Sequence, residues 1–413
     1  MLAPYRRLFA PQGTAAFSSS GFLARLALSM SGVSTVVMVS VLRHSYTLAG
    51  MVGGASLATA LLTVPLIGRL VDRYGQSRVA VPTALWSALM SAALVLCLHN
   101  GAPTWTLFAT SVLSATAPNV GGMARARWAE IYKKDPDSLH VANSFEQVLD
   151  EVCFIVGPIL AVALSTALFP EAGRLAALLL TVGGTLLFAL QRSTEPPVHP
   201  VDSNASGSPL GNRGLQVMMV VFLFTGAIFG SLEMATIAYT SSIGHRGLAG
   251  AVLALQAVGS ALSGVLFGLA TLRGTSTSRF LTGVAGMALF MLPLNLAGGI
   301  WSLAPLMFLA GMATSPTMIT AMGLTQELIP RSQINEGMTL AVTSLLGGIS
   351  VGSMVTGWTV QRFGSDFGYL LPSSAGALAL VAGLLGARTL RDLAAARNAR
   401  PASALATTEA VGA

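Results

Sequence analysis

Residues 47–98 read TLAGMVGGASLATALLTVPLIGRLVDRYGQSRVAVPTALWSALMSAALVLCL. Two apolar stretches of about 20 residues flank a short charged segment that starts at Gly68 and ends at Arg78. A helix of about 20 residues crosses the hydrocarbon core of a bilayer, so each stretch is long enough to span a membrane. The pattern predicts two transmembrane helices joined by a turn at the membrane surface.

The same alternation of apolar stretches and short polar turns continues along the chain. Of its 413 residues, 53% are hydrophobic and only 9% are charged, which lies outside the range of soluble domains. We therefore predict an all-α integral membrane protein with twelve transmembrane helices. The predicted spans are 15–42, 47–68, 79–98, 104–124, 141–168, 174–191, 214–241, 248–270, 280–298, 302–324, 337–360 and 369–388.

One long polar connection, from Ser193 to Asn212, is rich in proline and separates six predicted spans from six. This division suggests an internal duplication, and Thr116-Ala-Pro118 in the fourth span indeed matches Thr314-Ser-Pro316 in the tenth. We expect four segments: an N-terminal six-helix half over 1–192, a cytoplasmic linker over 193–213, a C-terminal six-helix half over 214–390, and a disordered cytoplasmic tail over 391–413.

The basic residues are distributed unevenly over the predicted connections. Most fall in the even-numbered connections or near the two ends, and only four fall on the opposite side of the membrane: Arg43, Arg174, Arg246 and Arg362. The positive-inside rule then places both termini in the cytoplasm. The net charge of +7 thus follows topology and does not indicate a nucleic acid partner. Because basic residues are nearly all arginine, as in GC-rich genomes, we expect a multi-pass protein of a bacterial plasma (inner) membrane.

The turn between the second and third spans carries a specific pattern. Gly68, three residues, Asp72, Arg73, one residue and Gly75 are followed by the basic Arg78. This resembles the loop motif of the major facilitator superfamily, whose members are transporters with two pseudo-symmetric six-helix bundles around a central cavity. The resemblance implies that Gly68 permits close helix contact. It also implies that the charged residues of the motif latch one conformation.

Two positions of this turn depart from the family pattern. Gln76 and Ser77 stand where the family usually has basic residues, which implies a weaker latch. An ordinary polar turn with basic residues on the cytoplasmic side is the alternative interpretation. In the fifth span, Gly157-Pro158 is similar to the antiporter motif of the same superfamily, although other glycines expected there are absent. This likeness favours export over import and implies a helix kink at the proline.

Five charged residues lie within predicted spans, where each costs about 2.5–3.5 kcal/mol at mid-depth. They are Arg25 in the first span, Glu146, Asp150 and Glu151 in the fifth, and Glu233 in the seventh. Arg25 and Asp150 lie at similar predicted depths, so we expect a buried ion pair between them. Glu146 shares a helix face with Asp150, whereas Glu151 is rotated by about 100°, so the three cannot use Arg25 equally.

These embedded charges are the candidates for substrate binding and proton coupling. In the functional interpretation, a surplus carboxylate of the fifth span takes up and releases a proton; in the structural one, a static ion-pair network joins the first and fifth spans. For Glu233 we favour a proton or cationic-substrate role over a hydrogen-bonded neutral acid. Arg125, Arg127 and Trp128 fall where the fourth span meets the cytoplasm, and we expect arginines that extend to lipid headgroups beside an interfacial tryptophan; substrate contact is the alternative.

Signatures of other functions are missing or misplaced. The only lysines, Lys133 and Lys134, do not belong to a phosphate-binding loop, and no histidines have metal-ligand spacing. Gly348-Ile-Ser350-Val-Gly352 matches the hydrolase elbow, but it lies within a span with no histidine after it, so we expect a helix-packing face. We expect no enzyme activity, cofactor or metal.

The sequence therefore predicts a secondary active transporter of a small molecule that works by alternating access. We expect a monomer that exports a drug or metabolite in exchange for protons. The first alternative is an importer or facilitator of the same fold. A membrane-embedded enzyme or scaffold without transport is the second.

Overall fold

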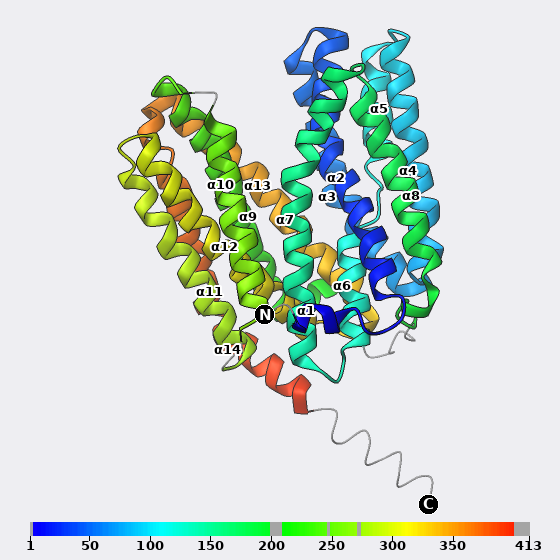
Figure 1. Cartoon of the computed structure of the whole chain (residues 1–413), viewed down its shortest axis with the longest axis vertical. Coiled ribbons are helices and arrows are strands. Elements are labelled where there is room, and N and C mark those ends of the chain that lie inside the picture. Colours follow the sequence, from blue (N-terminus) through cyan, green and yellow to red (C-terminus); the bar gives the residue numbers. More distant parts are fainter. Residues whose placement is uncertain (1–2, 199–208, 246–247, 271–273, 400–413) are drawn as a thin grey trace, which may run out of the picture. The chain divides into compact units, whose positions relative to one another are not determined.

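The computed structural model describes residues 3–198, 209–245, 248–270 and 274–399 (Figure 1). Over these residues the chain is helical, as predicted, and no strand occurs among them. It forms two compact units, residues 1–203 and 204–413, which are described separately below. Within the described residues, eleven helices are long and apolar enough to cross a membrane.

The first unit consists of α1 to α8 and a short 3-10 helix, η1. Around α2 pack α7 on one side and α8 on the other, and α4 packs against α8 (Figure 1). Gly184 of α8 permits this close approach, because a Cβ atom there would lie only 2.6 Å from the backbone nitrogen of Ala24. The elements are α1 Ala3–Leu8, α2 Thr14–Arg43, α3 Tyr46–Tyr74, α4 Gln76–His99, α5 Thr104–Ser114, α6 Val120–Ile131, α7 Pro136–Ala167, α8 Ala172–Leu190 and η1 Arg192–Thr194.

The fourth predicted span, 104–124, is wrong as a single helix. Helix α5 ends at Ser114, and α6 begins at Val120. Pro118 has no backbone N–H, so it cannot bond to the carbonyl of Ser114 four residues earlier. That carbonyl instead accepts a hydrogen bond of 2.5 Å from the Ser87 hydroxyl of α4. The break is thus stabilised by a side chain of a neighbouring helix.

The residues around Pro118 complete the break. The carbonyl of Ala115 accepts a hydrogen bond from the Thr63 hydroxyl of α3 at 2.6 Å. The side chain of Asn119 then accepts the N–H of Gly122 at 3.1 Å and caps the start of α6. The matching proline of the second unit, Pro316, lies inside a continuous helix. The proline alone therefore does not decide whether the helix breaks.

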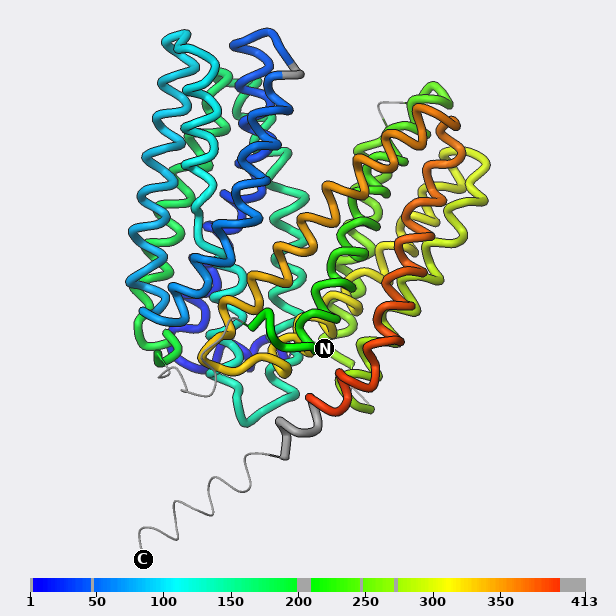
Figure 2. The backbone as a smooth tube through the Cα atoms, turned by 180° about the vertical axis from the view of Figure 1, so that it is seen from behind, coloured from blue at the N-terminus to red at the C-terminus, as the bar shows by residue number. Residues whose placement is uncertain are grey.

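The second unit consists of α9 to α14 with short 3-10 helices. Its helix α9 packs against α13 and α14, while α12 packs against α10 and α11. Figure 2 shows α13, in orange, running beside α9, in green. The helices are α9 Arg213–Ser242, α10 Ala249–Gly268, α11 Ser276–Met291, α12 Ile300–Leu328, α13 Ile334–Phe363 and α14 Leu370–Ala399, and the 3-10 helices are η3 Pro209–Gly211, η5 Leu292–Leu296, η6 Arg331–Gln333 and η7 Ser365–Phe367.

Helices α9 and α13 approach each other through glycines. A Cβ atom on Gly348 would lie 1.9 Å from the backbone oxygen of Leu223, and one on Gly226 would lie 1.9 Å from that of Leu345. Neither position can hold a side chain without moving a backbone. The stretch from Gly348 to Gly352 is therefore a helix-packing face, as expected from the sequence.

The start of the expected C-terminal tail differs in the structure. Helix α14 continues to Ala399, so residues 391–399 are helical and do not belong to a disordered tail. Residues 400–413 of the expected tail and 199–208 of the expected linker lie outside the described residues. Within the rest of the linker, η1 and η3 are short 3-10 helices, and Thr194 is buried in the first unit.

Candidate functional site

A cluster of charged side chains is buried between α2, α6 and α7 of the first unit. The Nη1 atom of Arg25 lies 2.7 Å from Oε2 of Glu146 and 3.0 Å from Oδ1 of Asp150. The predicted pair of Arg25 and Asp150 is thus present. Glu146, one helical turn before Asp150, is fully buried and shares the same guanidinium.

Two residues of α6 complete this cluster. Nη2 of Arg125 lies 2.7 Å from Oδ2 of Asp150, so each oxygen of this carboxylate faces a different arginine. The indole Nε1 of Trp128 donates a hydrogen bond of 2.6 Å to Oε1 of Glu146. Arg25, Arg125, Glu146 and Asp150, called the charge cluster below, balance two positive charges with two negative ones. Such pairing offsets the cost of burying each charge.

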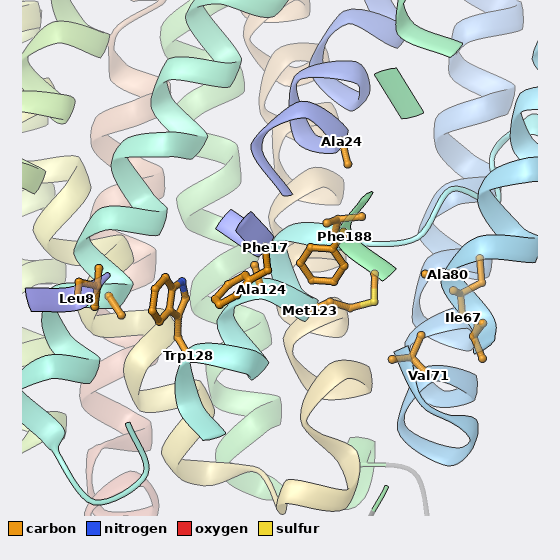
Figure 3. Close-up of a cluster of buried hydrophobic side chains, with 13 residues drawn as sticks. Leu8, Phe17, Ala24, Ile67, Val71, Ala80, Met123, Ala124, Trp128 and Phe188 are labelled. Atoms are coloured by element: carbon orange, nitrogen blue, oxygen red, sulfur yellow. The ribbon is translucent and has the colours of Figure 1, made fainter. Parts of the chain in front are cut away.

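The structure contradicts the predicted contact of Arg125, Arg127 and Trp128 with lipid headgroups. All three side chains are buried in the first unit. The guanidinium of Arg127 lies 3.8 Å from the ring centroid of Phe188, and Figure 3 shows Trp128 beside Phe17 in the same hydrophobic cluster. The helix break is the physical reason, because it makes α6 a separate helix that runs through the packed interior. Pro118 followed by the capping residue Asn119 was the sequence signal for it.

The prediction also includes two other carboxylates, Glu151 and Glu233. Glu151 accepts a hydrogen bond of 3.1 Å from Nε2 of Gln147, one turn earlier on α7. Glu233 lies on α9 of the second unit with an exposed side chain. Within the described part of the chain, Glu233 forms no ion pair. The structure therefore brings together Arg25, Glu146 and Asp150 within the first unit, whereas Glu233 belongs to the second unit.

The loop motif has a partner that the sequence analysis missed. Gly75, between α3 and α4, has φ +96°, a conformation that favours glycine, and a Cβ atom there would lie 3.1 Å from Oε1 of Glu195. Glu195 follows η1 and accepts hydrogen bonds from both the backbone N–H and the hydroxyl of Ser77, at 2.9 and 2.5 Å. The motif is thus attached to the segment that follows α8.

The two residues that depart from the family pattern make inward contacts. Gln76 is buried, donates to the carbonyl of Met123 at 3.1 Å and accepts from Nε of Arg127 at 2.8 Å. Arg127 also donates to the Thr194 hydroxyl at 2.8 Å. The remaining motif residues are Gly68, buried in α3, Asp72, half-buried, and Arg73 and Arg78, both exposed. Their role as a latch stays a prediction.

Gly157 and Pro158 lie in α7, which is continuous through both residues. A Cβ atom on Gly157 would lie 1.9 Å from the hydroxyl oxygen of Ser29 on α2. That hydroxyl donates a hydrogen bond of 2.8 Å to the carbonyl of Cys153. Glycine is therefore required where α2 and α7 are joined, about two turns of α7 beyond Asp150. The predicted kink stays a prediction.

Two helical units with paired charges buried among membrane-spanning helices are the architecture of a polytopic membrane protein. The family model of the Major Facilitator Superfamily matches residues 17–272, more than half of the chain. The chain therefore belongs to this superfamily of small-molecule transporters. Among curated proteins, no relative matches the chain.

Solved structures of transporters share the fold at low sequence identity. The human organic anion transporter MFSD10 (TETRAN) superimposes with a TM-score of 0.68 at 14% identity, covering 92% of this chain and 99% of that one. A bacterial homologue of the iron transporter ferroportin, outward-facing, gives 0.69 at 16%, covering 93% and 100%. The transporter FucP, also outward-facing, gives 0.71 at 15%, covering 91% and 98%. At these identities the likeness shows the fold alone.

Proposed function

We propose that this transporter exports a small organic molecule in exchange for protons, and that Asp150 carries the proton. The observation that supports this proposal is the position of Asp150 in the charge cluster. Its side chain accepts from both Arg25 and Arg125, yet it remains 22% exposed, whereas Glu146 is fully buried. Asp150 is therefore the carboxylate of the cluster that a proton from water reaches most directly.

Protonation of Asp150 would change both the charge and the packing of the cluster. With both carboxylates ionised, the cluster is neutral; with Asp150 protonated, one guanidinium charge is left uncompensated. An uncompensated charge inside a membrane protein is costly, so the protein must rearrange or admit water or a substrate anion. The same proton weakens the ion pairs by which Arg25 of α2 and Arg125 of α6 bind Asp150 of α7. Proton binding is thereby linked to helix packing, as coupled transport requires.

Other features of the chain support the remaining parts of the proposal. The likeness of Gly157-Pro158 to an antiporter motif favours export. The predominance of arginine over lysine supports a bacterial inner membrane, and the uneven distribution of basic residues supports a cytoplasmic position of both termini. We assign Glu233 as a second proton-binding acid, because it is an embedded carboxylate without an ion pair among the described residues. In this proposal a single copy of the chain performs the full transport cycle.

A facilitator or importer without proton coupling is the second candidate. The balanced charges of the cluster favour it, because a neutral set of ion pairs can join α2, α6 and α7 without ever exchanging a proton. In that case the cluster has only a structural role.

The test uses proteoliposomes that contain the full chain and a trapped pH-sensitive dye, pyranine, with the interior acidic. A panel of organic cations and organic anions is added outside, and proton movement and radiolabelled substrate exchange are both recorded. The variants are Asp150→Asn, Glu233→Gln and, as a control, Glu130→Gln. Glu130 forms an ion pair with Lys133 at 2.6 Å at the end of α6, outside the charge cluster.

The wild type and Glu130→Gln should move protons when a transported compound is added. Asp150→Asn should still exchange substrate for substrate but should no longer move protons with it. Proton movement by Asp150→Asn at the wild-type rate would mean that a residue other than Asp150 carries the coupled proton. Transport that ignores the pH gradient in every variant, including the wild type, would favour the facilitator.

A further inference from the structure

A groove opens on the second unit between α10 and α11, over α12. It has a volume of about 330 Å³ and lies entirely within this unit. Ala313 and Pro316 of α12 form its floor, and Phe267 at the end of α10 forms one wall. The other wall is a stripe along α11, formed by Ser278, Arg279, Thr282, Gly283, Gly286 and Phe290.

The α11 wall changes from polar to apolar along its length. Ser278, Arg279 and Thr282 lie near the start of the helix, while Phe290 lies near its end. From Arg279 to Phe290 the helix rises by about 16 Å, at 1.5 Å per residue. One leaflet of the hydrocarbon core is about 15 Å thick. The groove therefore has the length of one acyl chain, with a polar end for a headgroup at the start of α11.

Two glycines of α11 show that the groove is not simply a loosely packed helix contact. A Cβ atom on Gly283 would lie 3.1 Å from the Cα atom of Thr317, so Gly283 serves the contact with α12. A Cβ atom on Gly286 would meet no atom within 4 Å. Helix packing therefore does not require glycine at position 286. Its missing side chain is what leaves the middle of the groove open.

Arg279 supplies the charge at the polar end. Its Nη2 donates a hydrogen bond of 3.1 Å to the hydroxyl of Ser276, which in turn donates to Oε1 of Glu327 at 2.7 Å. Within the described residues, Arg279 has no carboxylate within ion-pair distance. A guanidinium held at the edge of a membrane in this way is a suitable partner for a phosphate group. The hydroxyls of Ser278 and Thr282 line the groove beside it.

We propose that this groove binds an anionic glycerophospholipid. The phosphate lies against Arg279, the glycerol region lies near Thr282, and one acyl chain follows the surface of Gly286 and Phe290. The apolar half of the groove favours a lipid over a free phosphate ion. Leu289 beside the groove is 63% exposed, as expected for a surface that faces acyl chains. The site is separate from the charge cluster, so it does not depend on the proposed transport mechanism.

Native mass spectrometry of the purified chain tests the proposal. The detergent-solubilised protein is titrated with phosphatidylglycerol or with phosphatidylcholine of identical acyl chains. The test variants are Arg279→Gln and Gly286→Leu. Two control variants match them in chemistry: Arg213→Gln changes an exposed arginine at the start of α9, and Gly183→Leu adds a side chain to α8 where a Cβ atom also meets nothing within 4 Å.

The wild type should retain one phosphatidylglycerol with an affinity about fivefold higher than for phosphatidylcholine, as expected for one basic residue near an anionic headgroup. Arg279→Gln should bind both lipids with the lower affinity. Gly286→Leu should lose the bound lipid of either kind, while both controls behave as the wild type. The proposal is overturned if the wild type does not distinguish the two lipids. It is equally overturned if Arg279→Gln keeps the preference or if Gly286→Leu retains as much lipid as Gly183→Leu.

Discussion

Removal of the Arg25 side-chain charge tests the physical description of the charge cluster most directly. In Arg25→Met, Glu146 keeps the hydrogen bond from Trp128 but loses the ion pair with Arg25 at 2.7 Å, while Asp150 keeps Arg125. Breaking a buried ion pair by removing one partner costs about 3–5 kcal/mol, because the other charge stays buried. At about 2–4 °C per kcal/mol, the apparent melting temperature should fall by about 6–20 °C.

A second substitution separates lost charge pairing from lost packing. In the double variant Arg25→Met with Glu146→Gln, no uncompensated charge remains, and the Gln side chain can still accept from Trp128. The double variant should therefore melt above Arg25→Met by several degrees, which corresponds to a coupling energy of about 1–3 kcal/mol.

The assay is thermal unfolding of the detergent-solubilised chain at one scan rate, followed by tryptophan fluorescence. Lys133→Met is the matched control, because it breaks the ion pair of Lys133 with Glu130, whose side chains are 42% and 20% exposed. That pair is expected to contribute only about 0.2–1 kcal/mol. A melting temperature of Arg25→Met within the range of this control, or a double variant no more stable than Arg25→Met, would refute the reasoning.

Two further outcomes follow from local geometry. Gly348→Leu should strongly lower the melting temperature or prevent folding, because its Cβ atom would lie 1.9 Å from the backbone oxygen of Leu223. Gly347→Leu is the control and should be tolerated, because its Cβ atom would lie 3.9 Å from a flexible side-chain atom. Asp135 caps α7, and hydrogen bonds from Ser138 hold the pKa of its carboxyl below the usual value. The stabilisation by this cap should be complete at neutral pH and should be lost as the pH falls through the lowered pKa. Asp135→Asn should show no such loss of stability in acid. Equal melting temperatures of the wild type and Asp135→Asn at every pH would contradict this assignment. Asp135→Ala should cost about 1 kcal/mol at neutral pH in the same melting assay.

The candidate site was only partly predictable. The pair of Arg25 and Asp150 could be predicted from their similar depth in the membrane, because a buried charge needs a partner of opposite charge. A single helix over the fourth predicted span would end at the membrane surface near Arg125 and Trp128, which is why the sequence predicts them there. Once α6 is a separate helix, both residues point from it toward α7, where they meet Asp150 and Glu146. The interruption of one predicted helix thus changed the environment of two side chains of the candidate site.

The loop motif shows a different limit of sequence reasoning. Its glycine and charge pattern is local, so the family resemblance could be recognised from a few consecutive residues. Its partner Glu195 is distant in sequence and follows η1, within the predicted cytoplasmic linker. No periodicity or spacing connects the two, because the contact depends on how α8 returns the chain beside the turn between α3 and α4.

By itself, the sequence determined the all-helical class, most of the membrane-spanning segments and the need for partners among the embedded charges. These properties depend on sums along the chain, since a segment crosses a membrane when enough consecutive residues are apolar. Only the tertiary structure decided which atoms meet. Gly286 and Gly348 are alike in the sequence, yet one borders an open groove and the other lies against a backbone oxygen. That difference arises entirely from the neighbouring helices, whose positions are set by packing between segments distant in sequence.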